Sequence, residues 1–484
     1  VEEGNAMLKE IAAISGDLDM IVSPDSLEGG CVGCDRGVIG PDVIVGDLNG
    51  MSYWGRTEIS PDNWFMSYST GTTSCNIGDQ QLEWFSSQNR HPVIGQTVYR
   101  IKNNVLQQIG QGWLKHGFFA LSQQLCTPGC QGTNGSWLGI NCSDPYTSGR
   151  NGQQSNLGPK YQIRAASGYF PYPPAGGTGI TNSTSRRVMV AQADLDLTQN
   201  AGAIYFTDGQ YVQWQDSQFE NDDNNSSWRR FLFTYNNNNT PNNPDDDTIS
   251  NPSFSGSTQR MKTPVDAWQF YVPTVETTNV SVVNDSNIQL NGTAGPQYWS
   301  GRFHVGNNVV DNGDGTWTYV YAIYNQNSDR SARSLTIPVA GAVNVTNAGF
   351  SDVPYHSGDG NGNTNFDGTD WTFTRGANTV SWNTQTFNQN QNANALRWGT
   401  TYTFWFTADA GPEAVNATLG LFRPGPDADP EFALRGPACL LAWDLDGNGD
   451  VGFGDLNLLL GEYGTTYDFG DLNELLGSYG ESCN

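Results

Sequence analysis

Short strand-like segments separated by turn residues recur through the second half of the chain. β-Branched and aromatic residues dominate each segment, and turn sequences rich in Gly and Asp, such as residues 311–315, lie between them. The segments are residues 317–323, 334–338, 371–374, 379–382, 401–406 and 418–422. Many short strands at this spacing, with no helical pattern between them, predict an antiparallel β-sandwich over residues 275–425.

The preceding region, residues 41–274, has the same character but longer loops. Residues 97–101 and 105–109 are strand-like, and the two residues that complete their connection, Asn103 and Asn104, tolerate the positive φ angles of a tight hairpin turn. Further strands are predicted at residues 42–46, 210–214 and 268–272. We therefore expect a β-rich domain with long loops here.

The two ends of the chain differ from this β-rich middle. Residues 2–15 place apolar side chains at helical spacing, which predicts a short amphipathic helix within an N-terminal extension, residues 1–40. A stretch rich in Pro at 424–430 indicates a linker, so residues 426–484 are expected to be a linker and a small module. The expected fold class is mostly β, with an N-terminal β-rich domain, an Ig-like antiparallel β-sandwich and a small α-helical C-terminal module.

Acidic residues greatly outnumber basic ones. The 484-residue chain has 49 Asp and Glu against 23 Lys and Arg, a formal net charge of −26. A chain this negative, with no basic block, is not expected to bind nucleic acid or an anionic membrane by neutralising phosphates. No apolar run approaches the roughly 18 residues of a membrane span, so no membrane insertion is expected. The chain begins with Val1, which predicts that a leader has been removed and that the protein is secreted, extracellular or at the cell surface.

The eight cysteines fall into two groups. Six lie in the first third of the chain and two bracket the C-terminal module: Cys31, Cys34, Cys75, Cys126, Cys130 and Cys142, then Cys439 and Cys483. A zinc site would need two closely spaced pairs or nearby histidines, which this pattern does not provide. We therefore predict disulfides, as in extracellular proteins, with Cys439 paired to Cys483 because neither has another cysteine near it in sequence.

One loop near the C-terminus carries a strong chemical pattern. Calcium binds six to eight oxygen atoms around one point, and alternate residues of a tightly wound loop can provide them. We expect ligands from the side chains of Asp444, Asp446 and Asn448. The carbonyl of Asp450 and the carboxylate of Asp455, at the start of the next helix, would complete the site. The predicted cofactor is Ca2+.

The helix that follows this loop is repeated. Residues 453–464 recur as 469–480, each copy with Asp near the N-terminus of a short helix and Leu on one face. The pair resembles a dockerin module, which has an EF-hand-type loop and helix in each of two repeats. The resemblance implies one calcium per repeat, but residues 465–468 offer a single carboxylate, so one ion is expected here.

The rest of the chain is similar to a group of uncharacterised, secreted proteins of planctomycete-type bacteria. The phrases that carry this resemblance are residues 42–48, 71–78, 91–96, 113–118, 142–146, 325–330 and 355–358. It covers nearly the whole chain and implies an extracellular multidomain protein, without an activity.

A second candidate calcium loop lacks the turn glycine. Asp359, Asn361, Asn363 and Asp370 have the separation of first and last oxygens that an EF-hand loop uses, but Thr364 stands where the glycine is needed. The alternative is an Asn- and Gly-rich loop stabilised by Asx-turns.

Two Asn- and Asp-rich tracts, residues 221–227 and 236–247, also offer clustered oxygens. Such tracts are more often solvated loops than calcium sites, and we favour that interpretation.

Catalytic motifs are absent from the sequence. It contains no HExxH, GxSxG, P-loop or dinucleotide-binding motif, and no context marks two carboxylates as a glycosidase pair. His91 and His116 could converge with Glu58 or Glu83 on a metal or acid–base site, although a structural role for each histidine is the interpretation that we favour. We expect no catalytic residue and no enzymatic activity.

Two functions are compatible with these features. The first is an extracellular structural protein, stabilised by calcium, whose copies associate into a filament or surface layer, with residues 1–40 docking on an adjacent subunit. The second is a secreted carbohydrate-binding or carbohydrate-degrading protein attached through its dockerin-like module, with exposed Trp and Tyr stacking on sugars. Sequons such as those at Asn134 and Asn416 allow surface glycans.

Overall fold

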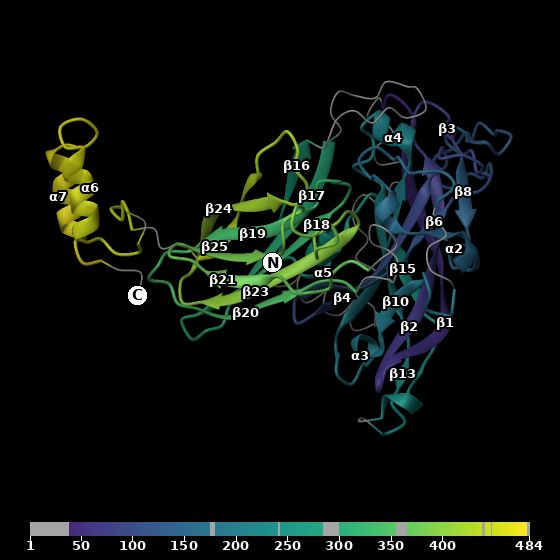
Figure 1. Cartoon of the computed structure of the whole chain (residues 1–484), viewed down its shortest axis with the longest axis horizontal. Coiled ribbons are helices and arrows are strands. Elements are labelled where there is room, and N and C mark those ends of the chain that lie inside the picture. The colour runs from purple at the N-terminus through teal and green to yellow at the C-terminus, as the bar shows by residue number, and fades with distance from the viewer. Residues whose placement is uncertain are drawn as a thin grey trace, which may run out of the picture.

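The chain is mostly β, as predicted, and forms two β domains followed by a pair of helices (Figure 1). The computed structural model describes residues 38–174, 180–240, 243–283, 300–354, 365–437, 441–446 and 448–481. The predicted helix at 2–15 and the predicted Cys439–Cys483 pair lie outside these ranges. None of the helices in the described ranges is long and apolar enough to cross a membrane.

A single large antiparallel sheet forms the first domain. Its strands lie in the order β1 (Val43–Ser60), β2 (Asn63–Asn76), β10 (Val188–Ala191), β5 (Val105–Gln111), β4 (Val93–Lys102), β11 (Ile204–Val212), β12 (Ser226–Leu232) and β15 (Ser253–Gln259). Three shorter strands pair alongside: β6 (Leu114–His116), β8 (Ser143–Tyr146) and β9 (Leu157–Gly158). Two separate two-stranded ladders join β3 (Leu82–Glu83) to β7 (Trp137–Leu138) and β13 (Tyr235–Asn236) to β14 (Thr248–Ile249). Short helices α2 (Ser148–Asn151), α3 (Gln192–Leu195) and α4 (Trp214–Gln218) lie in the connections.

The sheet curls until its first strand contacts its last two. Ser227 on β12 donates from Oγ to the Val45 carbonyl over 2.7 Å, and Thr258 on β15 donates from Oγ1 to Asp47 Oδ1 over 2.6 Å. Fully buried Trp84 and Tyr211 pack beneath the start of β1. Curling in this way encloses a core that a flat sheet would leave exposed on one face.

The predicted hairpin is confirmed. Strands β4 and β5 pair in antiparallel register, with Lys102 opposite Val105. Asn103 and Asn104 between them have φ angles of 51° and 62°, the left-handed conformation that a two-residue turn of this type requires.

Two disulfides link the first domain's long loop to its sheet, in agreement with the prediction of disulfides over zinc. Cys75 on β2 is bonded to Cys126, and Cys130 is bonded to Cys142. Disulfides of this kind are typical of proteins that fold in an oxidising environment.

The predicted strand at 268–272 is wrong, because these residues belong mainly to helix α5 (Pro264–Tyr271). Thr263 caps the helix by accepting from Asp266 N, and the Asp266 carboxylate accepts from Thr263 N in return. Such a capping box, with Pro at the first helical position, outweighs the β propensity of the aromatic residues that follow. Similarly, the predicted strand 210–214 ends at Val212, and Trp214 begins α4.

The second domain is an antiparallel β-sandwich of two five-stranded sheets. One sheet has the order β16 (Glu276–Val283), β17 (Ser300–Asp311), β18 (Trp317–Asn325), β23 (Thr400–Ala408) and β20 (Val345–Ser351). The other has the order β21 (Thr372–Arg375), β22 (Thr379–Asn383), β19 (Ala332–Pro338), β24 (Pro412–Leu421) and β25 (Glu431–Pro437). All six strands predicted for this region are present. Buried aromatic and aliphatic side chains from both sheets, among them Tyr321, Trp382 and Phe404, form one core.

The predicted linker from residue 426 is partly wrong. Residues 431–437 form β25, which pairs with β24 from Thr418–Glu431 to Pro412–Pro437 and buries Phe432 and Leu434 in the sandwich core. Alternation of these buried side chains with exposed ones is the ordinary pattern of a strand at the edge of a sandwich. The sandwich therefore extends beyond residue 425.

Helix α5 lies between the two domains. Trp268 is fully buried among side chains of both domains, including Tyr99 and Val320, and donates from Nε1 to the Asn104 carbonyl over 2.8 Å. On β17, Gly306 permits this close approach, since a Cβ there would lie only 2.9 Å from the Trp268 ring.

Direct hydrogen bonds add to this interface along strand β23. Thr401 N donates to Gln108 Oε1 over 2.7 Å, and Thr403 Oγ1 donates to the Leu106 carbonyl over 2.5 Å. Tyr324 on the neighbouring strand donates to Gln210 Oε1 over 3.1 Å. Buried polar groups of each domain find their hydrogen-bond partners in the other domain. The two β domains are therefore expected to behave as one body.

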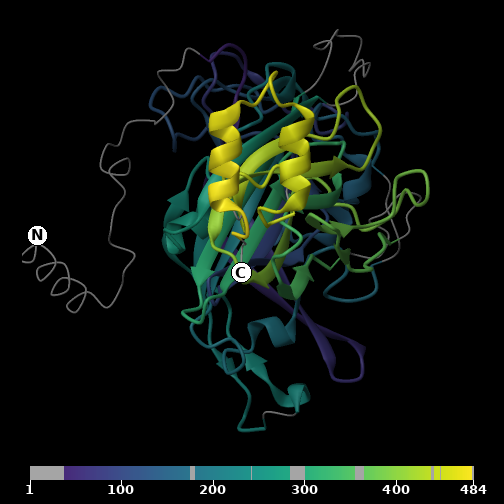
Figure 2. The same ribbon diagram turned by 90° about the vertical axis from the view of Figure 1, so that its left-hand side faces the viewer.

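The chain ends in two helices, α6 (Phe453–Gly461) and α7 (Phe469–Ser478), which lie side by side at the end of the sandwich remote from the first domain (Figures 1 and 2). Val451, Leu459 and Leu475 form their small core, with Trp443 and Tyr467 packed against it.

Candidate metal centre

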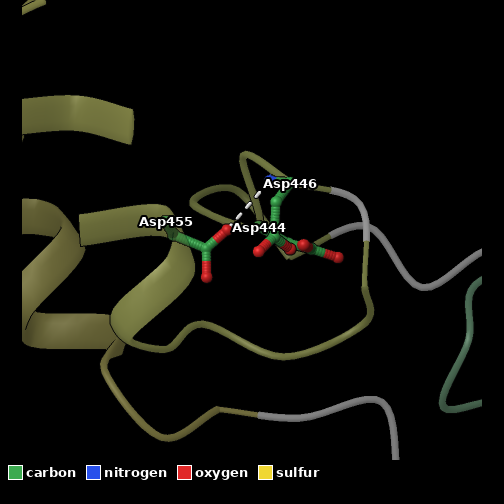
Figure 3. Close-up of side chains that lie close together, drawn as sticks. All are labelled: Asp444, Asp446 and Asp455. Carbon is green, nitrogen blue, oxygen red and sulfur yellow. Dashed lines mark hydrogen bonds between the residues drawn. The ribbon is translucent and has the colours of Figure 1, made fainter. Parts of the chain in front are cut away.

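Three aspartates converge in the loop before α6. Carboxylate oxygens of Asp444, Asp446 and Asp455 all lie within 4.8 Å of one another (Figure 3). Oxygen ligands of calcium lie 2.3–2.6 Å from the ion, so oxygens on opposite sides of it are no more than about 5 Å apart. The predicted trio is therefore brought to one point at a spacing that suits calcium.

Backbone hydrogen bonds within the loop determine this arrangement. Asn448 N and Gly449 N donate to the two oxygens of Asp444 over 3.0 and 2.8 Å, and Asp450 N donates to Asn448 Oδ1 over 2.8 Å. Gly449 has φ 87°, a conformation that residues with a Cβ seldom adopt. The tight turn that the sequence pattern predicts is thus formed.

Asp455 reaches the loop from the first turn of α6. Its side chain is completely buried, and it accepts from Gly452 N over 2.7 Å and from Asp446 N over 3.0 Å. A carboxylate near the N-terminus of a helix is stabilised by the helix dipole. Asp455 therefore connects the helix to the loop while remaining within reach of an ion.

No basic side chain of the C-terminal module offsets these charges. After Arg435 the sequence has nine Asp and Glu and no Lys, Arg or His. The pKa of Asp446 is raised by desolvation and by repulsion from Asp455, Asp444 and Asp450. A divalent cation would remove this repulsion, and the all-oxygen donor set suits a hard cation such as Ca2+.

The loop is also tied to the end of the second repeat. Val451 N donates to the Glu481 carbonyl over 2.9 Å, and Gly480 N donates to the Val451 carbonyl over 2.8 Å. The loop before α6 and the turn at residues 480–481 after α7 therefore stabilise each other. The contributions predicted for Asn448 and the Asp450 carbonyl stay predictions; Asn448 Oδ1 accepts from Asp450 N.

The second repeat uses its aspartates to cap a helix. Asp468 accepts from Gly470 N over 2.6 Å and from Asp471 N over 3.3 Å, while Asp471 accepts from Asp468 N over 2.7 Å. Both carboxylates are thus engaged with backbone N–H groups of α7. The expectation of one ion rather than two stays a prediction.

The other candidate calcium loop falls mainly outside the described ranges. Asp359, Asn361 and Asn363 are not described, and Asp370 is exposed. Nearby, Asp367 accepts from both the backbone and the side chain of Thr369, which is the Asx-type turn named as the alternative.

The two histidines singled out from the sequence do converge, but without either glutamate. His91 Nε2 lies 2.9 Å from His116 Nδ1, and both rings are buried beside Phe170. Burial is the main cause that lowers the pKa of His91 to about 4 and that of His116 to about 3, so the pair is neutral at physiological pH. Glu83 instead pairs with Arg90, and Glu58 is exposed at the end of β1. A structural role accounts for these contacts.

The Asn-rich tract 221–227 is less solvated than expected. Asp222 and Asn225 are buried, and Asn225 Nδ2 donates to Asp216 over 2.6 Å. Burial, with repulsion from Asp42 and Asp222, raises the pKa of Asp216 well above its ordinary value. Sequence reasoning missed this cluster because β1, whose Val43 N donates to Asp216, is 173 residues away in sequence. The described part of tract 236–247 is largely exposed, as predicted.

No protein-family model matches the chain, and a search of curated proteins finds no significant match. The resemblance of the C-terminal repeats to dockerin modules, and of the remainder to planctomycete-type proteins, accordingly stays a prediction.

Proposed function

We propose that the chain is an extracellular structural protein whose copies associate through the C-terminal helix pair, with calcium stabilising that pair. The observation that carries the proposal is a set of exposed apolar side chains at equivalent positions of the two repeats. They are Phe453 and Phe469, Leu460 and Leu476, and Tyr463 and Tyr479.

The exposure of these side chains is large. Phe453 is 68% exposed and Phe469 65%, although each begins a helix whose opposite face is buried. A module with so few buried side chains gains nothing in its own stability from such residues. Several large apolar side chains exposed on one small module are typical of a protein–protein contact.

Other features support an assembly subunit rather than a sugar-binding protein. In the described part of the sandwich, every Trp and Tyr is buried or half-buried, which disfavours a flat stacking platform for sugars on that domain. The rigid pairing of the two β domains suits a structural role. The disulfides and the calcium loop both favour an extracellular medium.

Sedimentation velocity on the full chain tests the proposal. With calcium present, the wild-type chain should form larger species as concentration rises, and Phe453→Ser with Phe469→Ser should abolish them. Phe119→Ser is the matched control, because Phe119 is 66% exposed but lies in the first domain. If the wild type stays monomeric at high concentration with calcium, and electron micrographs show no polymer, the proposal fails.

A further inference from the structure

A pocket of about 250 Å³ opens where the two β domains meet. One wall is the segment 160–164 of the first domain, and the other walls come from the sandwich. Hydrogen bonds across the junction fix the walls: Trp398 Nε1 donates to the Ile163 carbonyl over 3.1 Å, and Ala165 N donates to Asp329 Oδ1 over 2.9 Å. Pockets at such domain junctions are frequent ligand sites.

The pocket is positively charged, in contrast to the molecule as a whole. Among the described residues, its lining has four cationic side chains, those of Lys160, Arg164, Arg397 and Arg423, and one carboxylate, that of Asp329. Four positive charges and one negative charge leave a net charge of about +3, in a chain whose total is −26 and which has only 23 Lys and Arg. Such a concentration of one sign in a concave site attracts an anion.

Neutral groups contact two of the cations. Lys160 Nζ donates to the Gly399 carbonyl over 3.1 Å and lies 4.8 Å from the centre of the Trp398 ring. Arg397 donates to the Ala393 carbonyl over 3.0 Å, and its guanidinium lies 3.7 Å from the centre of the Phe366 ring. Carbonyls and ring faces orient a cation without cancelling its charge.

The other two cations share Asp329. This carboxylate is half-buried; desolvation raises its pKa to about 6, while the charges of Arg423 and Arg164 act in the opposite direction. Burial lowers the pKa of Arg423, while Asp329 raises it and Arg164 lowers it. Two guanidinium groups that repel each other and share one carboxylate in the same pocket would be stabilised by a second anion.

We propose that this pocket binds a small organic oxyanion, with a carboxylate or phosphate group facing Arg164 and Arg423 on a body of about monosaccharide size. Planar guanidinium groups match both kinds of oxyanion. The volume is somewhat below the roughly 300 Å³ at which pockets for drug-sized ligands begin, so the body must be small.

Isothermal titration calorimetry on the full chain at low ionic strength tests this. The probes are glucuronate, glucose 6-phosphate, inorganic phosphate and uncharged glucose. At least one of the two sugar anions should bind at least tenfold more tightly than glucose, and the tighter of the two identifies the oxyanion. Equal binding of all sugars, or binding of inorganic phosphate without either sugar anion, would overturn the proposal.

Two variants should shift the affinity in opposite directions. Arg164→Gln removes a half-buried pocket cation and should weaken binding about tenfold or more. Asp329→Asn keeps an acceptor for Ala165 N but removes the competing charge, and should tighten binding several-fold. An effect opposite to either would contradict the proposal.

Arg150→Gln is the control for net charge, because Arg150 is exposed on α2 and does not line the pocket. It should bind the anion as the wild type does. If Asp329→Asn fails to fold, the comparison of Arg164→Gln with Arg150→Gln decides, and equal affinities for these two would overturn the proposal.

Discussion

At the residue scale, the interior of the first domain contains a carboxyl group that resists ionisation. Asp208 on β11 is fully buried and accepts from Ser226 Oγ over 2.5 Å and from Thr97 Oγ1 over 3.5 Å. Burial raises its pKa to about 8, although these hydrogen bonds and the charge of Lys160 act in the opposite direction. Near neutral pH the native state therefore holds a proton at Asp208.

This proton makes stability depend on pH. In the unfolded chain an Asp ionises near pH 4. Between about pH 4 and 8 the native state binds more protons at Asp208 than the unfolded state, so its contribution to stability is complete below about pH 4 and is lost as the pH rises through 8. As the pH rises from about 4 to 8, the free energy of unfolding of Asp208→Asn should therefore increase relative to that of the wild type, by up to about 1.4 kcal/mol per pH unit. Urea unfolding of both chains at pH 5 and pH 8 measures this, and a difference that does not change with pH would refute it.

Among the predicted calcium ligands, Asp446 is the one best suited to mutation. It is exposed, unlike Asp455, so its loss should affect ion binding more than folding. Calcium at 100 times its Kd stabilises a native state by about 2.7 kcal/mol. Asp446→Ala should abolish the calcium-dependent rise in melting temperature of the C-terminal module, and Glu474→Ala, exposed on α7, should preserve it. Equal calcium responses in the two variants would contradict the assignment.

At the element scale, the strands with the most regular pattern are the ones that sequence could predict. The six sandwich segments and the Asn103–Asn104 hairpin combine strand-forming residues with clear turn signals, so local and tertiary preferences agree. Helix α5 shows the limit. Its aromatic residues suggest a strand, and only the Thr263–Asp266 capping box reveals the helix.

The candidate sites also differ in whether the local sequence marks them. The convergence of Asp444, Asp446 and Asp455 could be predicted because these residues are close in sequence and their spacing indicates an oxygen-lined loop. The cationic pocket was not, because Arg164 and Arg423 are brought together by the domain junction and nothing near either residue marks it.

The packing of α5 can be tested through Gly306. An added methyl group would lie 2.9 Å from the Trp268 ring and 3.0 Å from Val265 Cγ1, closer than side chains normally pack. Overpacking of this kind typically costs about 1–3 kcal/mol. Gly306→Ala should lower the free energy of unfolding by that amount. Gly368→Ala is the control, since a Cβ there meets no atom within 4 Å, and it should change stability much less.

At the scale of the whole molecule, the chain comprises one large body and one small one. The two β domains share a buried core around Trp268 and many hydrogen bonds, whereas the helix pair has a core of its own. Cooperative unfolding follows shared cores rather than the number of domains.

Calorimetry should therefore show two transitions rather than three. One belongs to the two β domains together and should not respond to calcium, and the smaller one belongs to the helix pair and should move to higher temperature when calcium is added. Thr401→Val, which removes the side-chain contact with Tyr99 while keeping the backbone donor, should lower the larger transition without splitting it. Separate melting of the first domain and the sandwich would contradict this picture.

If the chain assembles as proposed, the junction along β23 has a mechanical consequence. A load applied between the first domain and the helix pair does not pass through a single covalent connection between the β domains. Hydrogen bonds from Thr401, Thr403 and Lys160 carry it in parallel, together with the packing around α5. Under tension the two β domains would therefore resist as one stiff unit, and extension would have to begin elsewhere along the subunit.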